Sequence, residues 1–137
     1  MKIYGIGADI VKTDRIKKIL RRKSALKRLF NIDEIKKCKE TKNSSNCFAK
    51  RFAAKEAFSK ALGTGISKGI SFNEIIILNE KSGKPYIKLI GHTKSIVEKK
   101  LKKKKFKISL SLTDEDNYAV AFVTISIWVI QNLKKLL

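Results

Sequence analysis

Two carboxylates and one lysine carry the chemistry that this sequence suggests. Acidic residues are scarce, with 12 Asp and Glu against 32 Lys and Arg and a net charge of +20. Asp9 lies inside an apolar segment, where a carboxylate is costly to bury unless it is paired or bound to a cation. Glu56 is the single acid between Thr41 and Asn73, and Lys60 follows one helical turn later on the same face. A Glu–Lys surface pair would explain the last two residues alone, so they indicate a site only together with Asp9.

Mg²⁺ is the cation that such a pair of carboxylates would suit. It takes few protein oxygens and completes its shell with waters and substrate phosphates. Lys60 would then face a phosphate oxygen, and a turn of Gly63, Thr64 and Gly65 would offer backbone N–H groups to an anion. The pattern therefore indicates a Mg²⁺-dependent site for a pyrophosphate compound, with Asp9 and Glu56 as metal ligands.

Asp9 is expected to lie on a strand of residues 3–11. Successive side chains of a strand point to opposite faces, so Asp9 shares its face with Gly5 and Gly7, where a bulky neighbour can approach closely. The opposite face is predicted to point to the core, with Tyr4, Ile6, Ala8 and Ile10.

Glu56 and Lys60 are expected on a helix of residues 46–62, which Gly63 ends. A helix of residues 13–30 is predicted before it, with Thr13 as the N-cap. The other predicted elements are a helix at 32–39, strands at 71–78 and 86–90, a helix at 92–101 and strands at 106–112 and 118–127. This order predicts one compact α+β domain of antiparallel strands and packed helices over residues 1–137, ending in a tail, residues 128–137, that suits a short amphipathic helix.

Composition narrows the class of protein. A hydrophobic fraction of 43% predicts a folded chain. Cys38 and Cys47 stand outside any CxxC motif, which predicts two reduced thiols and no metal site at the cysteines. The longest apolar run, residues 118–130, is shorter than the roughly 20 residues of a spanning helix, and no signal-peptide pattern is seen. We therefore expect a cytoplasmic protein without a membrane span.

The positive charge favours an anionic partner: nucleic acid, an acidic membrane surface, an acidic protein or a phosphate-rich small molecule. A lysine-rich surface with no specific partner is an equal alternative. A small nucleic-acid-binding protein is the second hypothesis, supported by the Lys102–Lys105 block but by no RNP, zinc-finger or helix-turn-helix motif. A membrane-surface protein using the basic tail is the third. Two carboxylates at a phosphate site favour a Mg²⁺-dependent enzyme over either.

Residues 5–11 and 51–66 resemble the two signature motifs of the holo-(acyl-carrier-protein) synthases. Their sequences are GIGADIV and RFAAKEAFSKALGTGI. Further matches are SFNE at 71–74, GKP at 83–85, LTDE at 112–115 and YA at 118–119. The resemblance extends from residue 3 to about residue 127.

The resemblance implies a 4′-phosphopantetheinyl transferase fold and activity. Such an enzyme moves 4′-phosphopantetheine from coenzyme A to a serine of apo acyl carrier protein, releases adenosine 3′,5′-bisphosphate and supports fatty acid biosynthesis. Asp9 and Glu56 would hold Mg²⁺, Lys60 would neutralise the transferring phosphate, and residues 63–65 would lie against the nucleotide. Glu56, Asp9 or a water would take the serine proton. The family further implies a homotrimer with sites between subunits, and no nucleic acid partner.

The acidic carrier protein is expected to dock on basic residues of the first predicted helix, namely Arg15, Arg21, Arg22 and Arg28. The sequence departs from the family at Asp114, where many members carry a histidine, and this aspartate would share in proton transfer or oppose a neighbouring subunit. Lys12 stands where an acid is common. His92 is expected to have a surface or capping role, and Trp128 a packing or interface role.

Overall fold

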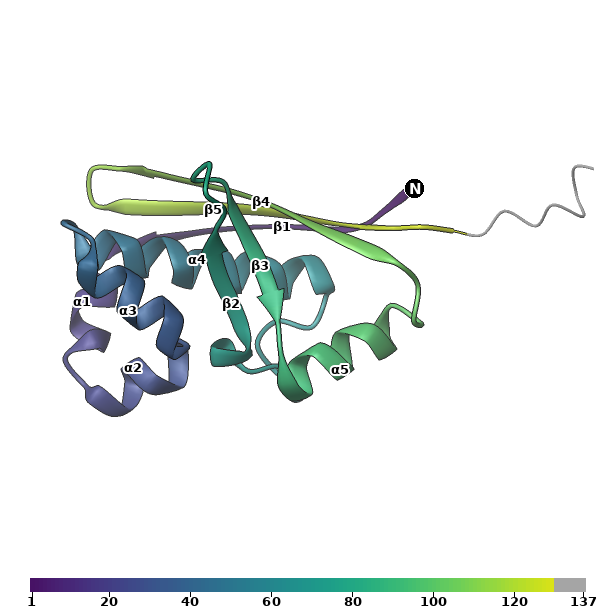
Figure 1. Ribbon diagram of the computed structural model, residues 1–137, viewed down its shortest axis with the longest axis horizontal. Helices are drawn as coiled ribbons and strands as arrows, with labels where there is room; N and C mark the ends of the chain where they lie inside the picture. Colours follow the sequence, from purple (N-terminus) through teal and green to yellow (C-terminus); the bar gives the residue numbers. More distant parts are fainter. Residues whose placement is uncertain (130–137) are drawn as a thin grey trace, which may run out of the picture.

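The computed structural model describes residues 1–129 and shows an α+β domain with two antiparallel sheets (Figure 1). A three-stranded sheet has the order β1-β5-β4, and a separate hairpin pairs β2 with β3. The elements in chain order are β1 (Lys2–Lys12), α1 (Thr13–Leu20), α2 (Lys23–Leu29), α3 (Ile32–Glu40), α4 (Ser44–Leu62), the 3₁₀ turn η1 (Phe72–Glu74), β2 (Ile75–Asn79), β3 (Pro85–Leu89), α5 (Gly91–Lys100), β4 (Phe106–Glu115) and β5 (Tyr118–Ile127).

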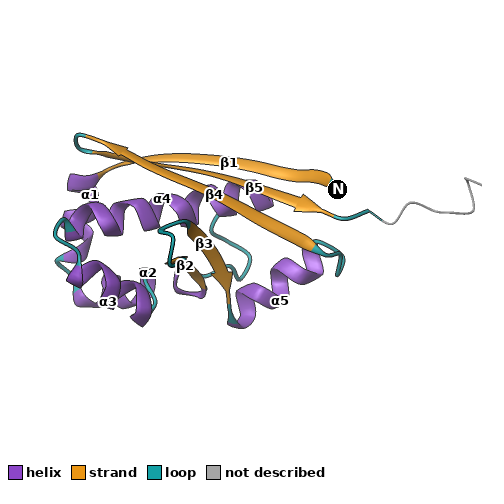
Figure 2. Cartoon of the chain, turned by 45° about the horizontal axis from the view of Figure 1, so that its top comes forward, coloured by secondary structure: helices purple, strands orange, loops and turns teal. Residues whose placement is uncertain are grey.

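Helix α4 is the centre of the molecule. It lies along one face of the three-stranded sheet and also contacts β2 of the hairpin (Figure 2). Its aromatic side chains Phe48, Phe52 and Phe58 are at most 5% exposed, as expected for core residues. Gly63 ends the helix in the left-handed conformation with φ 91°, which confirms the predicted stop.

Two glycines of β1 bring this strand against the backbone of α4. A Cβ atom at Gly5 would overlap the carbonyl oxygen of Ala61, and one at Gly7 would overlap that of Ala57. Helix and strand can therefore approach this closely only because both positions lack a side chain.

The prediction that Tyr4, Ile6, Ala8 and Ile10 of β1 point to the core is wrong. Ile6 and Ile10 are 62% and 61% exposed, and Phe122 on the neighbouring strand β5 is 46% exposed. The reason is that α4 covers the glycine-lined face, so the isoleucines point away from it. The three-stranded sheet thus presents an uncovered apolar face.

The predicted helix of residues 13–30 is also wrong, because the chain bends at Arg21 and Arg22. Arg22 has φ −99° and ψ 115°, which is extended backbone, and α2 starts after it. The bend turns α2 back so that Phe30 reaches the core, where its ring centroid lies 4.9 Å from that of Phe48. Thr13 is the first residue of α1 and does not cap it, since the N-cap position is Lys12.

The prediction of two reduced thiols is contradicted as well: Cys38 and Cys47 form a disulfide. The turn between α3 and α4 folds one helix back on the other and leaves the two Cα atoms 5.4 Å apart. A nine-residue separation in sequence therefore becomes a direct contact, because the cysteines lie on the facing sides of two packed helices.

A buried ion pair also joins α3 to α4. Lys55 Nζ lies 2.6 Å from Glu34 Oε1 and donates hydrogen bonds to the carbonyl oxygens of Leu29 and Phe72, both at 2.8 Å. Both side chains are fully buried. Burial lowers the pKa of Lys55 to about 8, although the charge of Glu34 acts to raise it. Together these contacts attach α2, α3 and η1 to the central helix.

The remaining predicted elements agree in kind with the structure. The strand expected at 71–78 starts only at Ile75, because residues 72–74 form the turn η1. His92 lies exposed at the start of α5, in agreement with its expected surface or capping role. Trp128 and Val129 follow β5 outside any helix, and the rest of the predicted tail helix lies outside the described residues. Within residues 1–129, no helix has both the length and the apolar character needed to cross a membrane.

Candidate functional site

Asp9 of β1 and Lys60 of α4 are in direct contact, next to the close approach of the two elements at Gly5 and Gly7. Lys60 Nζ lies 3.1 Å from Asp9 Oδ1 and 3.1 Å from the carbonyl oxygen of Ala8. The Asp9 side chain is 17% exposed and that of Lys60 is 52% exposed. The lysine therefore bridges strand and helix while its charge stays accessible from solvent.

Glu56 lies one turn before Lys60 and completes the group of three residues predicted from the sequence. Burial raises the pKa of Glu56, and the negative charge of Asp9 raises it further, while Lys60 and Arg15 act to lower it. The contribution of the Asp9 charge to the raised pKa of Glu56 places the two carboxylates within range of electrostatic repulsion. A divalent cation between them would remove this repulsion.

The donor set fits a hard cation of low protein coordination number. Within residues 1–129 no group of three or more His, Cys, Asp or Glu side chains is close enough to hold a metal ion. The chain can thus offer two carboxylates and must leave the other positions to waters and to substrate oxygens, which is how Mg²⁺ is bound in many phosphate-processing sites.

A shallow cavity of about 250 Å³ adjoins Asp9 and Lys60. It is lined by Asp9 and Lys60 together with Ala8, Ile10 and Val120. Ile10 belongs to the uncovered apolar face of the sheet. The candidate site therefore lies at the border of that face.

The backbone N–H groups of the turn after α4 were expected to be free to bind an anion, but they form hydrogen bonds within the chain. The N–H groups of Gly63, Thr64 and Gly65 all donate to the carbonyl oxygen of Ser59, at 3.1, 3.3 and 3.2 Å. The prediction that these N–H groups are available to an anion is wrong, because they satisfy the last turn of α4. The position of residues 63–65 against a nucleotide stays a prediction.

The basic residues predicted to bind the carrier protein are separated by the bend after α1. Arg15 is exposed, and its guanidinium lies 5.7 Å from the ring centroid of Phe52. Its charge acts to lower the pKa of Glu56. Arg21 is exposed at the other end of α1, and Arg22 and Arg28 lie at α2. The structure thus places Arg15 beside the carboxylates and the other arginines along two short helices.

A second polar pocket, of about 410 Å³, was not predicted from the sequence. Its lining includes Lys37, Lys50, Arg51, Asn79 and Lys81. These residues come from α3, α4 and the β2–β3 hairpin, and the Arg51 guanidinium is 3.0 Å from Asn79 Oδ1. Because the cations are scattered along the chain, no sequence pattern could show that they converge.

Asp114 lies next to this pocket and is engaged within its own chain. Its carboxylate accepts a hydrogen bond from the Asn46 amide at 2.9 Å and lies 3.4 Å from Lys50 Nζ. The hydrogen bond from Asn46 lowers the pKa of Asp114, as does the charge of Lys50. Asp114 is thus paired with Asn46 and Lys50 of its own chain, while proton transfer and contact with a neighbouring subunit stay predictions.

Arg51 and Glu56 point to different flanks of α4. Five residues of α-helix correspond to a rotation of about 500°, so the two side chains are about 140° apart around the axis. The cationic pocket and the two carboxylates therefore do not face a common space within one chain.

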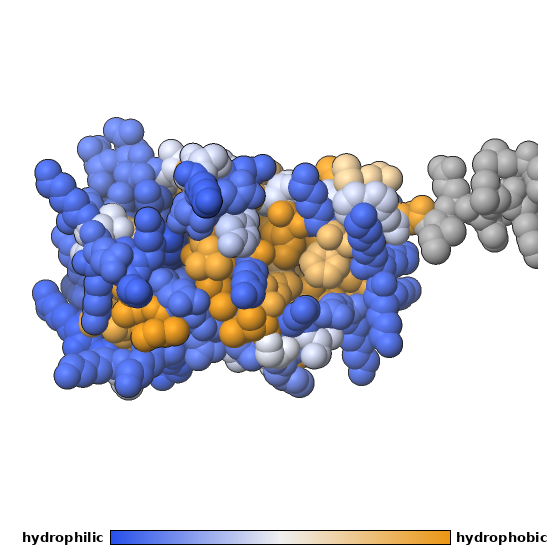
Figure 3. All heavy atoms as spheres, in the orientation of Figure 1, coloured by the Kyte–Doolittle hydropathy of each residue, from blue (hydrophilic) through white to orange (hydrophobic). Residues whose placement is uncertain are grey.

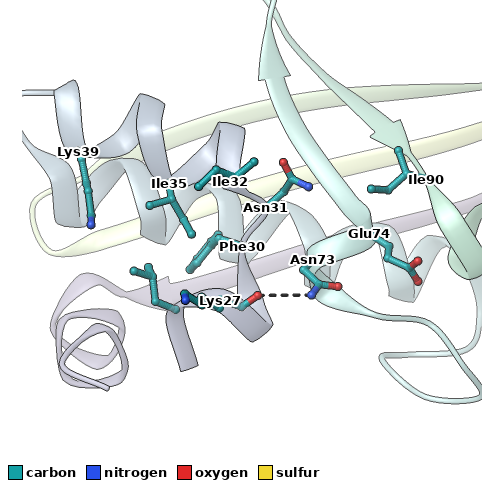
Figure 4. A pocket seen from close by; sticks show the side chains of 10 residues that line it. Lys27, Phe30, Asn31, Ile32, Ile35, Lys39, Asn73, Glu74 and Ile90 are labelled. Carbon is teal, nitrogen blue, oxygen red and sulfur yellow. Dashed lines mark hydrogen bonds between the residues drawn. The ribbon is translucent and has the colours of Figure 1, made fainter. Parts of the chain in front are cut away.

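A larger cavity, of about 630 Å³, lies elsewhere and contains none of the predicted site residues (Figure 4). Its lining is mostly apolar, with Leu26, Phe30, Ile32, Ile35 and Ile90. The charged residues at its edge do not include a pair of carboxylates. Chemistry, and not size, therefore identifies the site at Asp9 and Glu56.

Comparisons with known proteins agree with this site. The 4′-phosphopantetheinyl transferase superfamily profile matches residues 5–123. The holo-[acyl-carrier-protein] synthase of Pelagibacter ubique is 46% identical over 123 residues, covering 90% of this chain and 96% of the relative. The crystal structure of the Neisseria meningitidis holo-[acyl-carrier-protein] synthase superposes with a TM-score of 0.80 at 36% identity, covering 90% of this chain and 98% of that one. The Bacillus anthracis synthase, in complex with CoA (3′,5′-ADP), has a TM-score of 0.75 at 34% identity, covering 91% and 97%. The chain therefore belongs to the holo-[acyl-carrier-protein] synthase family of the 4′-phosphopantetheinyl transferase superfamily.

Proposed function

We propose that this protein transfers the 4′-phosphopantetheine group of coenzyme A to a serine of apo acyl carrier protein, for fatty acid biosynthesis in the cytoplasm. The products are holo carrier and adenosine 3′,5′-bisphosphate. The observation that carries this proposal is the convergence of Asp9, Glu56 and Lys60 between β1 and α4. Family membership and the coenzyme A complex of the Bacillus anthracis relative support the choice of donor.

Asp9 and Glu56 are the residues that would hold Mg²⁺. When bound there, the ion would polarise the pyrophosphate of coenzyme A and offset the charge that develops on it. Lys60 leaves Asp9 and neutralises an oxygen of the transferring phosphate, so its ammonium group acts where negative charge accumulates. The proton of the attacking serine passes to one of the two carboxylates or to a water held beside them.

The active form is proposed to be a homotrimer. Ile6, Ile10 and Phe122 leave an apolar face uncovered, and such faces commonly mark contacts between chains. The candidate site borders this face, while the cationic pocket around Arg51 points to another flank of α4. In a closed ring of three chains, the pocket of one subunit can face the carboxylates of the next. The nucleotide would then bind between subunits, with residues 63–65 against it.

The acidic carrier protein is proposed to dock on α1 and α2. Arg15, Arg21, Arg22 and Arg28 give this part of the chain a positive surface, and Arg15 is close enough to Glu56 for its charge to act on that carboxyl group. Opposite charges would bring the carrier serine toward the transferring phosphate.

A transfer assay tests the proposal. The protein is incubated with coenzyme A, MgCl₂ and an apo acyl carrier protein, and the carrier is weighed by mass spectrometry. We expect the carrier to gain one phosphopantetheine group with the wild type and none with Glu56→Gln. Glu40→Gln, an exposed position at the end of α3, is the matched control and should remain active. An unmodified carrier under conditions in which another transferase works would refute the proposed activity.

A further inference from the structure

One end of the three-stranded sheet carries a dense group of lysines. Six of the seven residues from 99 to 105 are lysines, and all six are exposed. The seventh, Leu101, is only 2% exposed and fixes the segment to the core. In Figure 3 hydrophilic side chains flank the point where the described chain ends. The proposed transfer reaction makes no use of this segment.

The backbone holds these lysines in a defined position. The N–H of Lys103 donates to the carbonyl oxygen of Glu98 at 2.8 Å, and that of Lys104 donates to Leu101 at 3.1 Å. Within residues 1–129, no carboxylate forms an ion pair with any of the six lysines. Their charges are therefore free to meet an external anion.

Apolar side chains lie directly beside the lysines. The N–H of Trp128 donates to the carbonyl oxygen of Lys105 at 3.0 Å, and Lys105 Nζ lies 5.0 Å from the centroid of the indole. Trp128 is 37% exposed and Val129 is 47% exposed. These two residues and Lys102–Lys105 together line a cavity of about 510 Å³. We name Lys99, Lys100, Lys102–Lys105, Trp128 and Val129 the lysine–tryptophan patch.

We propose that the lysine–tryptophan patch binds the surface of an anionic phospholipid bilayer. Clustered lysines are attracted to anionic headgroups, by about fivefold in affinity for each lysine. Tryptophan is favoured at the depth of the headgroups because one end of the indole is apolar and the other can hydrogen-bond. The chain continues from this patch for eight more residues, IQNLKKLL, which combine the same two kinds of side chain.

The composition of the patch favours a bilayer over a nucleic acid. Proteins that bind single strands stack successive bases on several aromatic rings, and this patch has one ring. Specific contacts to bases rely largely on the bidentate guanidinium of arginine, and every cation of the patch is a lysine. Point charges beside an apolar anchor suit a fluid anionic surface, which has no fixed geometry to match.

The single tryptophan of the chain supplies the test, because all indole fluorescence arises from the patch. The full-length protein is mixed with vesicles of phosphatidylcholine alone or with added phosphatidylglycerol. We expect a blue shift of the emission and protection from acrylamide only with the anionic vesicles, and loss of both effects in high salt. An unchanged emission with anionic vesicles would overturn the proposal.

Charge-matched variants separate the patch from the general positive charge. The first variant replaces Lys102, Lys103, Lys104 and Lys105 with Gln, and the control replaces four other exposed lysines with Gln, namely Lys36, Lys42, Lys88 and Lys94. Vesicle cosedimentation should weaken by a few hundred-fold for the first variant, at about fivefold per lysine, and much less for the control. An equal loss of vesicle binding in the two variants would contradict the proposal. Preferential binding of an RNA oligonucleotide by the patch, over the vesicles, would also contradict it. Transfer activity measured without vesicles should be unchanged in the first variant, so that vesicle binding and transfer activity fail independently.

Discussion

Lys60 Nζ lies 3.1 Å from Asp9 Oδ1, so the ammonium group that is proposed to meet the phosphate occupies the place beside the carboxylate before substrate arrives. The pair joins α4 to β1, and half of the Lys60 side chain remains exposed. Surface pairs of this kind are weak. The lysine can therefore exchange the carboxylate for a phosphate at little cost.

Replacing Lys60 should slow the transfer step. We expect Lys60→Gln to lower kcat by about 100- to 1,000-fold, because one stabilising charge is lost where negative charge develops. Thermal unfolding should be almost unchanged. Steady-state kinetics with Lys94→Gln, an exposed lysine of α5, provide the matched control. A kcat of Lys60→Gln close to that of the control would contradict the role of this ammonium group.

The repulsion between the two carboxylates can be measured directly. The charge of Asp9 contributes to the raised pKa of Glu56, so Asp9→Asn should lower the pKa of that carboxyl group. A ¹³C-detected NMR titration of the Glu56 side chain checks this without any substrate. Glu40 provides an exposed glutamate as an internal reference. An unchanged Glu56 pKa in Asp9→Asn would show that the two groups do not interact.

Mg²⁺ activation should depend on pH through the same group. A protonated Glu56 cannot bind a cation, and burial raises the pKa of Glu56 above its ordinary value of 4.5. As pH falls through this raised pKa, protons compete with the metal, and the Mg²⁺ concentration for half-maximal activity should rise. Mg²⁺ titrations of the wild-type enzyme at a series of pH values measure the Mg²⁺ concentration for half-maximal activity. A constant requirement across that range would exclude Glu56 as a ligand.

The close approach of β1 to α4 should make Gly7 intolerant of any side chain. A Cβ in Gly7→Ala would overlap the carbonyl oxygen of Ala57, so strand and helix would have to separate. We expect a loss of about 1–3 kcal/mol in the free energy of unfolding, measured by urea denaturation. Ser111→Ala, on the exposed face of β4, is the control and should change stability little. A Gly7→Ala protein as stable as the control would mean that the contact is looser than described.

Replacing one residue of the buried Lys55–Glu34 pair should lower the free energy of unfolding more than replacing both. Lys55→Met leaves the Glu34 carboxylate without its cation in the core, and we expect a loss of about 3–5 kcal/mol. The double variant Glu34→Gln, Lys55→Met should recover part of this loss, since no unpaired charge remains. Additive losses in urea denaturation would show that the two residues are not coupled.

Charge reversal on α1 should raise KM for the carrier protein and leave KM for coenzyme A unchanged. Arg15→Glu is expected to raise KM for the acidic carrier protein by about tenfold, with KM for coenzyme A unchanged. Added salt should weaken carrier binding by the wild type and reduce the difference between the two proteins. Lys36→Glu, on α3, reverses an exposed charge elsewhere. An equal rise in KM for both substrates would place Arg15 in the nucleotide site.

The candidate site was predictable because its signals are local. An acid inside an apolar strand and a Glu–Lys pair one turn apart are visible in the sequence, and the structure brings Asp9 and Lys60 together. Other features depend on packing. Alternation along β1 identifies two faces but not which one is covered, and the glycines decided this by admitting α4.

The other failures have similar causes. A helical pattern through residues 13–30 does not show the bend at Arg22, which accompanies a contact between Phe30 and Phe48 of a different helix. The Cys38–Cys47 bond and the pocket around Arg51 join residues of different elements. Such features follow from the arrangement of helices in space, which no short sequence window records.

The uncovered face around Ile6, Ile10 and Phe122 has a thermodynamic consequence for the proposed trimer. If this face is covered only by other copies of the chain, unfolding is coupled to dissociation, and stability follows mass action. The melting temperature should then rise with protein concentration, and dilution should destabilise the fold and inactivate the enzyme together. The cell would control the activity of each chain partly by how many chains it makes.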